Sequence, residues 1–434
     1  MKSAQPKVLH ELCGRPMLWW VLEALRAAGA DEVVVVTSPE LDPLLEGFGV
    51  RTVVQSEQLG TGHAVKVALE ALEPRDGCIV VAYGDMPLVD RTIFEDVQAA
   101  VDPDAGTALA LVTAKMPLPS AFGRVVRSGS AVERIVEAKD CTPEQLALEE
   151  MNAGIYAYDE AALRRAIVQV GNDNAQREYY LTDTVELLIA SGHRVAPVPV
   201  ADYRSVLGVN DRVELANARA LLNARLCEEH MRAGVTIVDP ATTYLEPGLA
   251  LAADVVIYPN TTLCGETRIG EATSIGPNTR IASSSIGARC KIHDSVVSAS
   301  QIADDVHVGP FAHLRGGTVL GGHVHVGNFV ETKKAKLAED VKVGHLSYLG
   351  DTTVGPRTNV GAGTITCNYD GERKHETHIG ADAFIGTNTS LVAPITVGDG
   401  AITGAGTVAI RDVEPGDKVV GNPARSIAKK PAGA

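Results

Sequence analysis

Residues 343–371, VGHLSYLGDTTVGPRTNVGAGTITCNYDG, decide the fold of the C-terminal half of the chain. The stretch holds a histidine, two tyrosines, two asparagines and many glycines, and it lies within a long array with a short repeat. Aliphatic residues recur every six positions in this array: Ile257, Leu263, Ile269, Ile275 and Ile281; Val308 and Leu314; Leu337, Val343 and Leu349; and Ile379, Ile385, Leu391 and Val397.

A six-residue period fits neither an amphipathic helix nor an alternating strand, and it is typical of a hexapeptide parallel β-helix. Three hexads form one triangular coil, with the aliphatic residue inside and small residues at the corners. Each coil buries its face only against the next coil, so the array must be long. The alternative, an all-β sandwich with chance spacing, does not explain the repeated sixes.

Bulk composition narrows the class of protein. A chain of 434 residues is too long for one ordinary core, so two or three domains are expected. The net charge of -15 argues against a general binder of nucleic acid or anionic membranes. The seven cysteines are scattered without a C-x-x-C, which favours reduced thiols in a cytoplasmic protein. MKSAQPKVLH lacks an apolar signal segment and no run of about 18 apolar residues occurs, so we expect neither export nor membrane insertion.

In the first half, apolar runs alternate with helical patterns. Helices are predicted at 17–29 and 63–73, and strands at 32–37, 50–55 and 78–83. Continuous Val/Ile runs between amphipathic helices predict an α/β domain with a mostly parallel sheet covered on both faces. Ligands of such sheets bind beyond the carboxyl ends of the strands.

Polar residues follow the predicted strands at that edge. Gly60 and Gly62, in QSEQLGTGH, open a helix whose N-terminus favours an anion, although an ordinary strand-to-helix turn explains them as well. Asp85 follows a strand in YGDMPL and is suited to hold Mg²⁺ against phosphates, or else caps the helix after Pro87. Lys7 either pairs with phosphate or is simply solvated.

Together these segments resemble the sugar-1-phosphate nucleotidyltransferase family. The motifs are PKVLH (6–10), QSEQLGTGHA (55–64), YGDMPL (83–88), FGRVV (122–126), IVEAKD (135–140), MNAGIY (151–156), NAQREYYLTD (174–183) and GVND (208–211). The resemblance implies a Rossmann-like domain in which a sugar phosphate attacks the α-phosphate of UTP and releases pyrophosphate.

The same resemblance implies roles for single residues. Asp85 and Asn210 would hold Mg²⁺. The nucleotide would contact Lys7, Gln55, Gly60, Thr61, Tyr83 and Gly84. The sugar would contact Gly123, Glu137 and Asn152, and the UDP-sugar product would share these contacts and that of Asn210.

The family begins with a strand and a Gly-rich loop ending in G-T-R-M, just upstream of P-K-V-L-H. The present sequence begins at Met1, roughly at the Met of that motif. From the resemblance we expect this polypeptide, without the loop that cradles the triphosphate, to be a poor uridylyltransferase.

Four segments are predicted along the chain. A nucleotidyltransferase domain covers 1–210, and a helix rich in Ala, Leu, Arg and Glu links the domains at 211–234. A β-helix covers 235–425, and a flexible tail follows at 426–434.

The C-terminal half resembles the hexapeptide acyltransferases, which have left-handed β-helices and usually form trimers with active sites between subunits. The segments GPFAHLRGG (309–317), GNFVETKKAKL (327–337), GHLSYLGD (344–351) and NVGAGTITCNYDG (359–371) carry a closer resemblance. Over both halves the chain resembles the family of bifunctional N-acetylglucosamine-1-phosphate uridylyltransferase/glucosamine-1-phosphate N-acetyltransferase enzymes. The resemblance implies acetyl-CoA and UTP as co-substrates, UDP-N-acetylglucosamine as product and a homotrimer.

An amine that attacks a thioester is largely protonated at neutral pH, so a base helps, and histidine is the side chain tuned for that task. His345 is the candidate, although a lone histidine often only fills a coil face. From the resemblance, the sugar phosphate would be held by Arg315 and Lys333, the sugar by Tyr348, Asn359, Asn368 and Tyr369, and acetyl-CoA by Ala362, Thr387, Ala405 and Arg425. Thr387 stands where Ser is usual, and Asn422 where some relatives have Arg.

Other interpretations stay open at the level of sequence. His323 and His325, two apart, are a weak candidate for a metal pair. The chain is alternatively a nucleotidyltransferase whose β-helix only assembles trimers or binds an effector, or a scaffold without catalysis.

Overall fold

The computed structural model describes residues 1–427. The chain forms two compact units, Met1–Leu221 and a second unit that begins at Leu222. The boundary falls within helix α7 (Arg212–Arg232), at the predicted linker. Asp211 caps this helix, because its carboxylate accepts hydrogen bonds from the backbone N–H groups of Val213 and Glu214, both at 2.8 Å.

The five elements predicted in the first unit are present as α1, α2, β3, β4 and β5, with ends that differ by a few residues. The helices are η1 (Lys7–Leu9), α1 (Met17–Ala27), η2 (Asp42–Leu45), α2 (Thr61–Ala71), α3 (Arg91–Ala99), α4 (Pro143–Leu146), α5 (Glu160–Ile167), α6 (Asp183–Ala190) and η3 (Tyr203–Val206). The strands are β1 (Glu11–Leu12), β2 (Arg15–Pro16), β3 (Val34–Thr37), β4 (Arg51–Val54), β5 (Cys78–Val81), β6 (Thr107–Lys115), β7 (Arg124–Ser128), β8 (Ala131–Val136), β9 (Glu150–Asp159) and β10 (Arg194–Pro199).

The prediction of a mostly parallel sheet is wrong. The central sheet has the order β10-β6-β9-β7-β8, with β5 also paired to β9. Strand β9 runs antiparallel to β5, to β6 and to β7, whereas β10 and β6 are parallel. Strands β3 and β4 form a separate parallel pair. An apolar composition indicates that both faces of a strand are covered, but it does not indicate the direction of the neighbouring strand.

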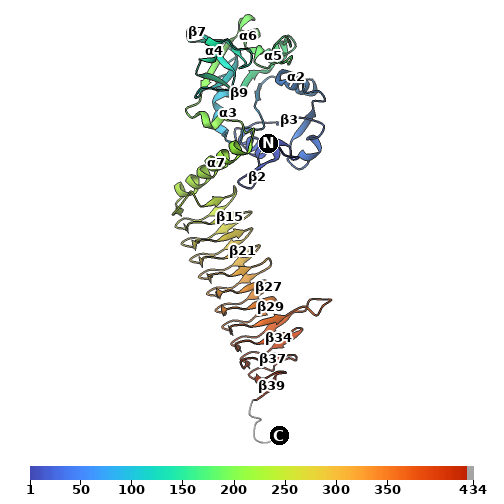
Figure 1. The fold of residues 1–434 in the computed structure, drawn as a ribbon, viewed down its shortest axis with the longest axis vertical. Coiled ribbons are helices and arrows are strands. Elements are labelled where there is room, and N and C mark those ends of the chain that lie inside the picture. Colours follow the sequence, from blue (N-terminus) through green and yellow to red (C-terminus); the bar gives the residue numbers. More distant parts are fainter. Residues whose placement is uncertain (428–434) are drawn as a thin grey trace. The chain divides into compact units, whose positions relative to one another are not determined.

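Both faces of the six-stranded sheet are covered by helices, as predicted. Leu109 and Leu111 of β6 pack with buried residues of α2, α5 and α6, whereas Ala110 and Val112 pack with those of α1 and α3. Successive side chains of a strand point to opposite faces, so a strand between two helical layers must be apolar throughout. Figure 1 shows the helices on the two sides of this sheet.

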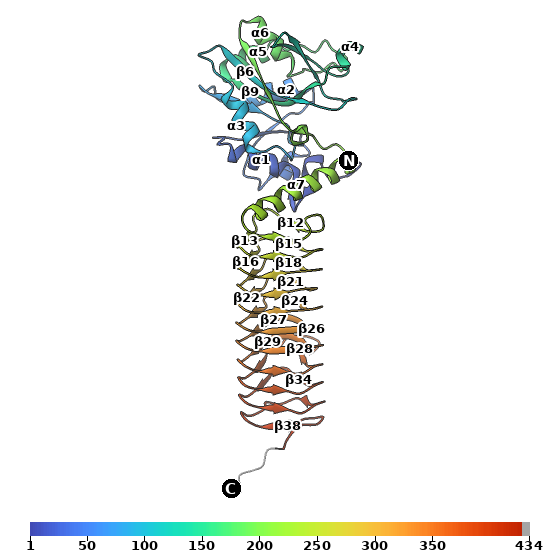
Figure 2. The ribbon, with the colours of Figure 1, turned by 90° about the vertical axis from the view of Figure 1, so that its left-hand side faces the viewer.

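The second unit is a stack of short strands in two sheets, which Figures 1 and 2 show as successive rungs. The 12-stranded sheet contains β11 (Thr236–Ile237), β14 (Val256–Ile257), β17 (Ser274–Ile275), β20 (Lys291–Ile292), β23 (His307–Val308), β26 (His325–Asn328), β28 (Lys342–His345), β30 (Asn359–Val360), β33 (Phe384–Ile385), β36 (Ile402–Thr403), β38 (Lys418–Val420) and β39 (Arg425–Ser426).

The 17-stranded sheet wraps the rest of each coil. It contains β12 (Tyr244–Leu245), β13 (Ala250–Leu251), β15 (Thr262–Cys264), β16 (Arg268–Ile269), β18 (Arg280–Ala282), β19 (Ser285–Ile286), β21 (Val296–Ser298), β22 (Gln301–Ile302), β24 (His313–Leu314), β25 (Val319–Leu320), β27 (Glu331–Leu337), β29 (Tyr348–Val354), β31 (Ile365–Cys367), β32 (Thr377–Ile379), β34 (Ser390–Val392), β35 (Ile395–Val397) and β37 (Val408–Ala409).

The predicted β-helix is confirmed. Strands pair in parallel with the equivalent strand one coil later, as Ile257 does with Ile275 and Leu263 with Ile281. These aliphatic residues point inward, since each of the four is completely buried. The second unit is therefore the left-handed parallel β-helix expected of the hexapeptide repeats.

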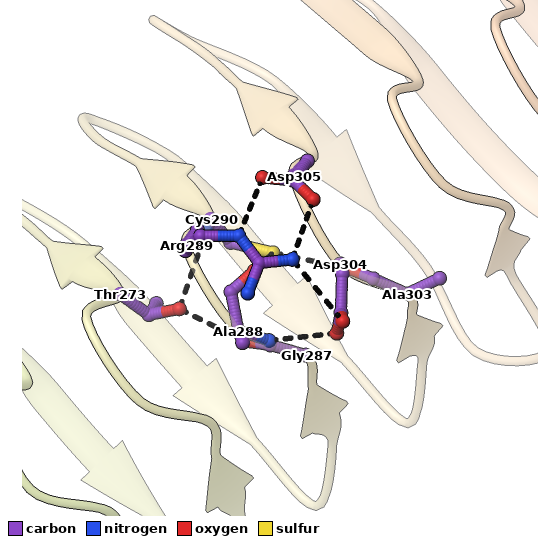
Figure 3. A network of polar contacts seen from close by, with 8 residues as sticks. All are labelled: Thr273, Gly287, Ala288, Arg289, Cys290, Ala303, Asp304 and Asp305. Atoms are coloured by element: carbon purple, nitrogen blue, oxygen red, sulfur yellow. Dashed lines mark hydrogen bonds and ion pairs between the residues drawn. The ribbon is translucent and has the colours of Figure 1, made fainter.

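Many corners of the coils contain a residue with left-handed backbone geometry. At one corner a column of such residues alternates in charge over part of its length, with Arg289 at φ 55° and Asp305 at φ 60° in neighbouring coils. The guanidinium of Arg289 donates to both carboxylate oxygens of Asp305, at 2.9 and 2.7 Å, and contacts Asp304 at 3.4 Å (Figure 3). Asp304 in turn accepts a hydrogen bond from the N–H of Ala288 at 2.9 Å, so the network joins two coils.

One irregular loop leaves the stack between β31 and β32 (Figure 1). Coil pairing continues across it, because Ile365 pairs with Ser390 and Thr352 with Thr377. At the far end of the unit, Ser426 of the predicted tail pairs with Val419, and the N–H of Ile427 donates to Lys418. Residues 428–434 of that tail lie outside the described residues.

Within residues 1–427, no helix combines the length and the apolar character that crossing a membrane requires.

Candidate functional site

The first candidate site is built around a lysine that contacts two predicted metal ligands. Asp85 follows β5, Asn210 precedes α7 and Lys7 begins η1. The Lys7 ammonium lies 2.5 Å from Asp85 Oδ2 and 2.9 Å from Asn210 Oδ1. A carboxylate and an amide oxygen that converge on one cation form a donor set of the kind that Mg²⁺ takes together with water and phosphate oxygens. These residues therefore fit the predicted metal.

The alternative role of Asp85 as a helix cap is excluded. The helix that follows is α3, and its cap is Asp90, whose carboxylate accepts hydrogen bonds from the N–H groups of Thr92 and Ile93. Asp85 instead lies 21% exposed beside Lys7, which leaves its oxygens available for a cation.

The glycine turn at the start of α2 packs against another part of the chain. A Cβ on Gly60, where φ is 108°, would lie 2.6 Å from the carbonyl oxygen of Tyr179, and one on Gly62 would lie 2.9 Å from it. The N–H of Gly62 donates to the same oxygen at 2.8 Å. The close packing against Tyr179 thus explains why glycine is needed at both positions, and this reason differs from the predicted approach to a ligand. The side chain of Gln55 spans the turn and donates to Gly60 O at 3.3 Å.

Tyr83 and Gly84 directly precede Asp85, and Tyr83 packs on a glycine of β9. A Cβ on Gly154 would lie 2.2 Å from Cε2 of Tyr83, so the ring rests directly on that glycine. Desolvation, aided by the charges of Glu137 and Asp85, raises the pKa of Tyr83 to about 12. The phenol therefore stays protonated at neutral pH and can donate a hydrogen bond.

The predicted sugar contacts meet on neighbouring strands. The N–H of Asn152 donates to Gly123 O at 2.9 Å, and a Cβ on Gly123 would lie 3.4 Å from Glu137 Oε2. The hydroxyl of Thr182 donates to Glu137 Oε1 at 3.1 Å. Burial raises the pKa of Glu137, and this hydrogen bond opposes the rise.

Two further residues beside these contacts had no role assigned from the sequence. Desolvation and then the charge of Glu137 raise the pKa of Asp183 to about 6. Arg124 is 1% exposed and donates to the carbonyl oxygens of Ser120 and Phe122, so it fixes the turn that carries Gly123. Both residues lie in quoted motifs, NAQREYYLTD and FGRVV, and their positions within these motifs were the available signal.

The second candidate site begins at one corner of the β-helix. His345 ends β28, and its exposed side chain precedes Leu346, which has left-handed geometry. In later coils the residues directly before the left-handed residue of this corner are Ala362, Thr387 and Ala405. The histidine and three of the predicted acetyl-CoA residues therefore share one position in four successive coils.

Cationic side chains gather on the adjoining face of the coils. The pKa of Lys333 is lowered by the neighbouring ammonium of Lys374 and then by Arg315, while Asp351 opposes the shift. Arg315 Nη1 lies 2.7 Å from Glu331 Oε1. The structure thus brings together the two predicted phosphate ligands and adds Lys374 from the projecting loop. The basic run ERKHE around Lys374 was the signal for it in the sequence.

Two predicted sugar ligands meet on the same face. A Cβ on Gly350 would lie 2.5 Å from the Tyr348 hydroxyl oxygen and 2.7 Å from Asn368 Nδ2. Asn368 is buried and donates to Asp351 Oδ2 at 2.5 Å. The missing side chain at Gly350 is therefore what lets these two groups come together.

The remaining predicted residues lie farther around the coils. Asn359 is on the 12-stranded sheet that also carries His345, next to Lys342 and Phe384 in register. Tyr369 is in the projecting loop, 60% exposed, with its hydroxyl donating to Gly371 O. Arg425 lies in β39 opposite Val420.

His323 and His325 do not lie on one strand face, as the alternative of a metal pair requires. His323 occupies a left-handed corner position before β26, so it does not share a strand face with His325. His325 instead faces His307 of the previous coil, with ring centroids 6.2 Å apart. Within residues 1–427 there is no group of three or more His, Cys, Asp or Glu placed to hold a metal ion.

Comparisons with known proteins identify the family of the chain. The model of the MobA-like NTP transferase domain matches residues 1–154. The bifunctional protein GlmU of Trichlorobacter lovleyi is 45% identical over 96% of this chain and 91% of its own length. That of Streptomyces avermitilis is 44% identical over 97% and 89%, and that of Staphylococcus haemolyticus 43% identical over 99% and 96%. The chain therefore belongs to the family of bifunctional GlmU proteins, transferases with N-acetyltransferase and uridylyltransferase activity in the synthesis of UDP-N-acetylglucosamine.

Proposed function

We propose that the corner of the β-helix at His345 is the acetyltransferase site, and that His345 is its general base. The amine of glucosamine-1-phosphate attacks the thioester carbon of acetyl-CoA, and the imidazole accepts a proton from that amine. The C–N bond forms, the C–S bond breaks, and the CoA thiolate leaves and is protonated. The observation that carries the proposal is the shared corner position of His345, Ala362, Thr387 and Ala405 in successive coils. A thioester that extends along this column presents its acetyl end to the imidazole.

The phosphate of the sugar would bind to the cations on the adjoining face. The chain has a net charge of -15, so an anion needs a local cluster of positive charges in order to bind. Three side chains supply such a cluster: Arg315, Lys333 and Lys374. The sugar ring would be oriented by four side chains: Tyr348, Asn359, Asn368 and Tyr369. The CoA phosphates would contact Arg425.

The test is substitution of the base. His345→Ala should abolish the release of CoA from acetyl-CoA and glucosamine-1-phosphate while it leaves uridylyl transfer unchanged. His313→Ala is a matched control, because His313 is also an exposed histidine of the β-helix but lies on β24. CoA release that is unchanged in His345→Ala would show that the base is another group.

For uridylyl transfer, a phosphate oxygen of N-acetylglucosamine-1-phosphate attacks the α-phosphorus of UTP, and the bond to pyrophosphate breaks. The nucleotide would contact Lys7, Gln55, Gly60, Thr61, Tyr83 and Gly84. The sugar would contact Gly123, Glu137 and Asn152. Asp85 and Asn210 would hold Mg²⁺, which when bound offsets charge on the reacting phosphates. Equilibrium binding of UTP to Asp85→Asn, measured with and without Mg²⁺, tests this assignment: the native chain should gain UTP affinity from Mg²⁺, and the variant should not.

A homotrimer is proposed from the resemblance to hexapeptide acyltransferases, and an apolar corner supports it. Phe311, Phe329 and Leu346 occupy left-handed positions in three successive coils and are 57, 59 and 63% exposed. The two phenyl rings stack with centroids 5.3 Å apart. Bulky side chains at positive φ are costly, and an exposed apolar row is unusual on a monomer, so we expect a second copy of the chain to cover it. Light scattering after size exclusion should give a trimer for the native chain and smaller species for Phe311→Ser/Phe329→Ser; a trimer in both would place the interface elsewhere.

A cytoplasmic location is proposed as well. Six cysteines are free thiols, three of them buried, and this fits a reducing compartment: Cys78, Cys141, Cys227, Cys264, Cys290 and Cys367.

A further inference from the structure

The ammonium of Lys7 occupies the position between the two oxygens that are proposed to hold Mg²⁺. It lies 2.5 Å from Asp85 Oδ2 and 2.9 Å from Asn210 Oδ1. The three residues come from segments that are far apart in sequence: η1, the turn after β5 and the turn before α7. One positive charge therefore already bridges both proposed ligands.

The segments that carry the two oxygens are held by bonds that do not involve Lys7. The N–H of Val209 donates to the backbone oxygen of Asp85 at 2.9 Å, and the N–H of Asn210 donates to Glu214 Oε2 at 2.6 Å. Gly208 completes the contact, since a Cβ there would lie 3.5 Å from Asp85 Oδ1. The backbone at Asp85 and at Asn210 is thus held independently of the lysine.

The lysine side chain is the movable part of the cluster. It is 36% exposed and has four rotatable methylene bonds, so its ammonium can reach other acceptors without any change in η1. The pair that it bridges carries only one formal negative charge, because the Asn210 amide is neutral. Two cations at the same two oxygens would repel each other, and that single charge cannot compensate both of them.

We propose that Lys7 is the resident cation of the Asp85–Asn210 pair and that a divalent metal enters only when phosphates draw the lysine away. A nucleoside triphosphate supplies anionic oxygens to which the Lys7 ammonium moves, and the freed carboxylate of Asp85 and amide oxygen of Asn210 would then hold the metal. Metal and nucleotide then bind together, and the protein without nucleotide has little affinity for the metal. This inference rests on the proposed assignment of Asp85 and Asn210 to Mg²⁺.

The experiment measures metal binding without nucleotide and without turnover. Mn²⁺ replaces Mg²⁺ as the probe, and the electron paramagnetic resonance signal of free Mn²⁺ gives the bound fraction for the full chain. Lys7→Met keeps the length of the side chain and removes its charge, so it should bind Mn²⁺ about tenfold more tightly than the native chain, because a unit charge a few ångströms away is removed. Lys66→Met is the matched control: Lys66 is an exposed lysine of α2, and its loss should not change Mn²⁺ affinity.

Two additional variants separate failure of this inference from failure of the metal assignment. The double variant Lys7→Met/Asp85→Asn should lose the gained Mn²⁺ affinity. Equal Mn²⁺ affinity in the native chain and Lys7→Met overturns the role of Lys7, and the separate UTP-binding test of Asp85→Asn still decides the metal assignment. A gain in Lys7→Met that survives Asp85→Asn places the metal elsewhere and overturns both. Lys7→Gln, checked for native circular dichroism, repeats the comparison with a polar side chain in case Lys7→Met does not fold.

The nucleotide supplies a second, independent readout. Saturating UTP should increase the Mn²⁺ affinity of the native chain more than that of Lys7→Met, since in the variant no lysine has to leave. An equal increase in both proteins contradicts the coupling between lysine release and metal entry.

Discussion

Tyr348 and Asn368 converge above Gly350: the tyrosine hydroxyl oxygen lies 2.5 Å, and the asparagine Nδ2 2.7 Å, from the position of a Cβ on that glycine. The two side chains come from β29 and from the start of the projecting loop, 20 residues apart in sequence. Gly350 has ordinary backbone geometry, so the absence of a side chain matters here for space and not for φ.

Gly350→Ala should therefore displace both sugar ligands while the coil remains intact. A displacement of about 1 Å at a positioning group costs on the order of 100-fold in rate, so kcat/KM for acetyl transfer should fall by about that factor. CoA release measures it. Gly322→Ala is the control, because its Cβ would meet only Asp304 O at 3.7 Å. Equal activity of the two variants would mean that Tyr348 and Asn368 do not orient the sugar.

Lys374→Ala should weaken the binding of glucosamine-1-phosphate. Its ammonium adjoins Lys333, and a charge-assisted hydrogen bond to phosphate contributes roughly 1.5–3 kcal/mol, so KM should rise about tenfold or more with kcat little changed. Initial rates of CoA release against sugar phosphate concentration give both constants. Lys336→Ala, an exposed lysine of the same strand as Lys333, should leave KM as it is. An unchanged KM in Lys374→Ala would remove this residue from the phosphate site.

Asp183 should make the first unit less stable as the pH rises through the weakly acidic range. Its pKa in the folded chain is about 6, above the ordinary 3.8, chiefly because of desolvation and then Glu137. The folded state therefore holds the proton more tightly than the unfolded state. The resulting stability is present in full below the unfolded pKa and is lost as the pH rises through about 6.

Asp183→Asn imitates the protonated form and should raise the melting temperature at neutral pH by about 2 °C, with no difference near pH 4. Calorimetric melts at several pH values measure the effect. Asp173→Asn changes an exposed carboxylate and should shift nothing. A gain that is the same at acidic and neutral pH would mean that the proton of Asp183 is not its cause.

The ion pair between Arg289 and Asp305 should matter less for stability than the core of the same coil. Arg289 is exposed and Asp305 is half-buried, so salt and water still screen their attraction. Arg289→Ala should lower the melting temperature slightly, and the difference should vanish in about 1 M NaCl. Ile292→Ala removes a side chain that is 1% exposed and should cost about 2–5 kcal/mol at any salt concentration. A larger loss from Arg289→Ala than from Ile292→Ala would contradict this order.

The β-helix could be predicted because its six-residue period can be recognised directly from the spacing of aliphatic residues. Ile257 and Ile275 stand a whole coil apart, and each inward position must be aliphatic for the coils to stack. The sheet of the first unit could not be predicted in the same way. Strand β9 is apolar because both of its faces are buried, and that composition is the same for parallel and antiparallel neighbours.

The corner column that begins at His345 was predicted from the family resemblance, and the repeat period alone does not reveal it. From His345 to Ala362, Thr387 and Ala405 the intervals are 17, 25 and 18 residues, which do not form a period. The long interval contains the loop after β31, and pairing on both sides of the loop restores the stack. Lys374 was missed for a related reason: its neighbour Lys333 is 41 residues earlier in sequence, and only the return of the loop brings them together.

The loop between β31 and β32 leaves the coil and rejoins it while Asn359 still pairs with Phe384 and Thr352 with Thr377. The loop is thus inserted into a stack whose strand pairing does not depend on the length of the loop. The loop can therefore be exchanged without changing the array. A loop of another length, grafted between Cys367 and Thr377, would place different side chains beside the same column of corner residues.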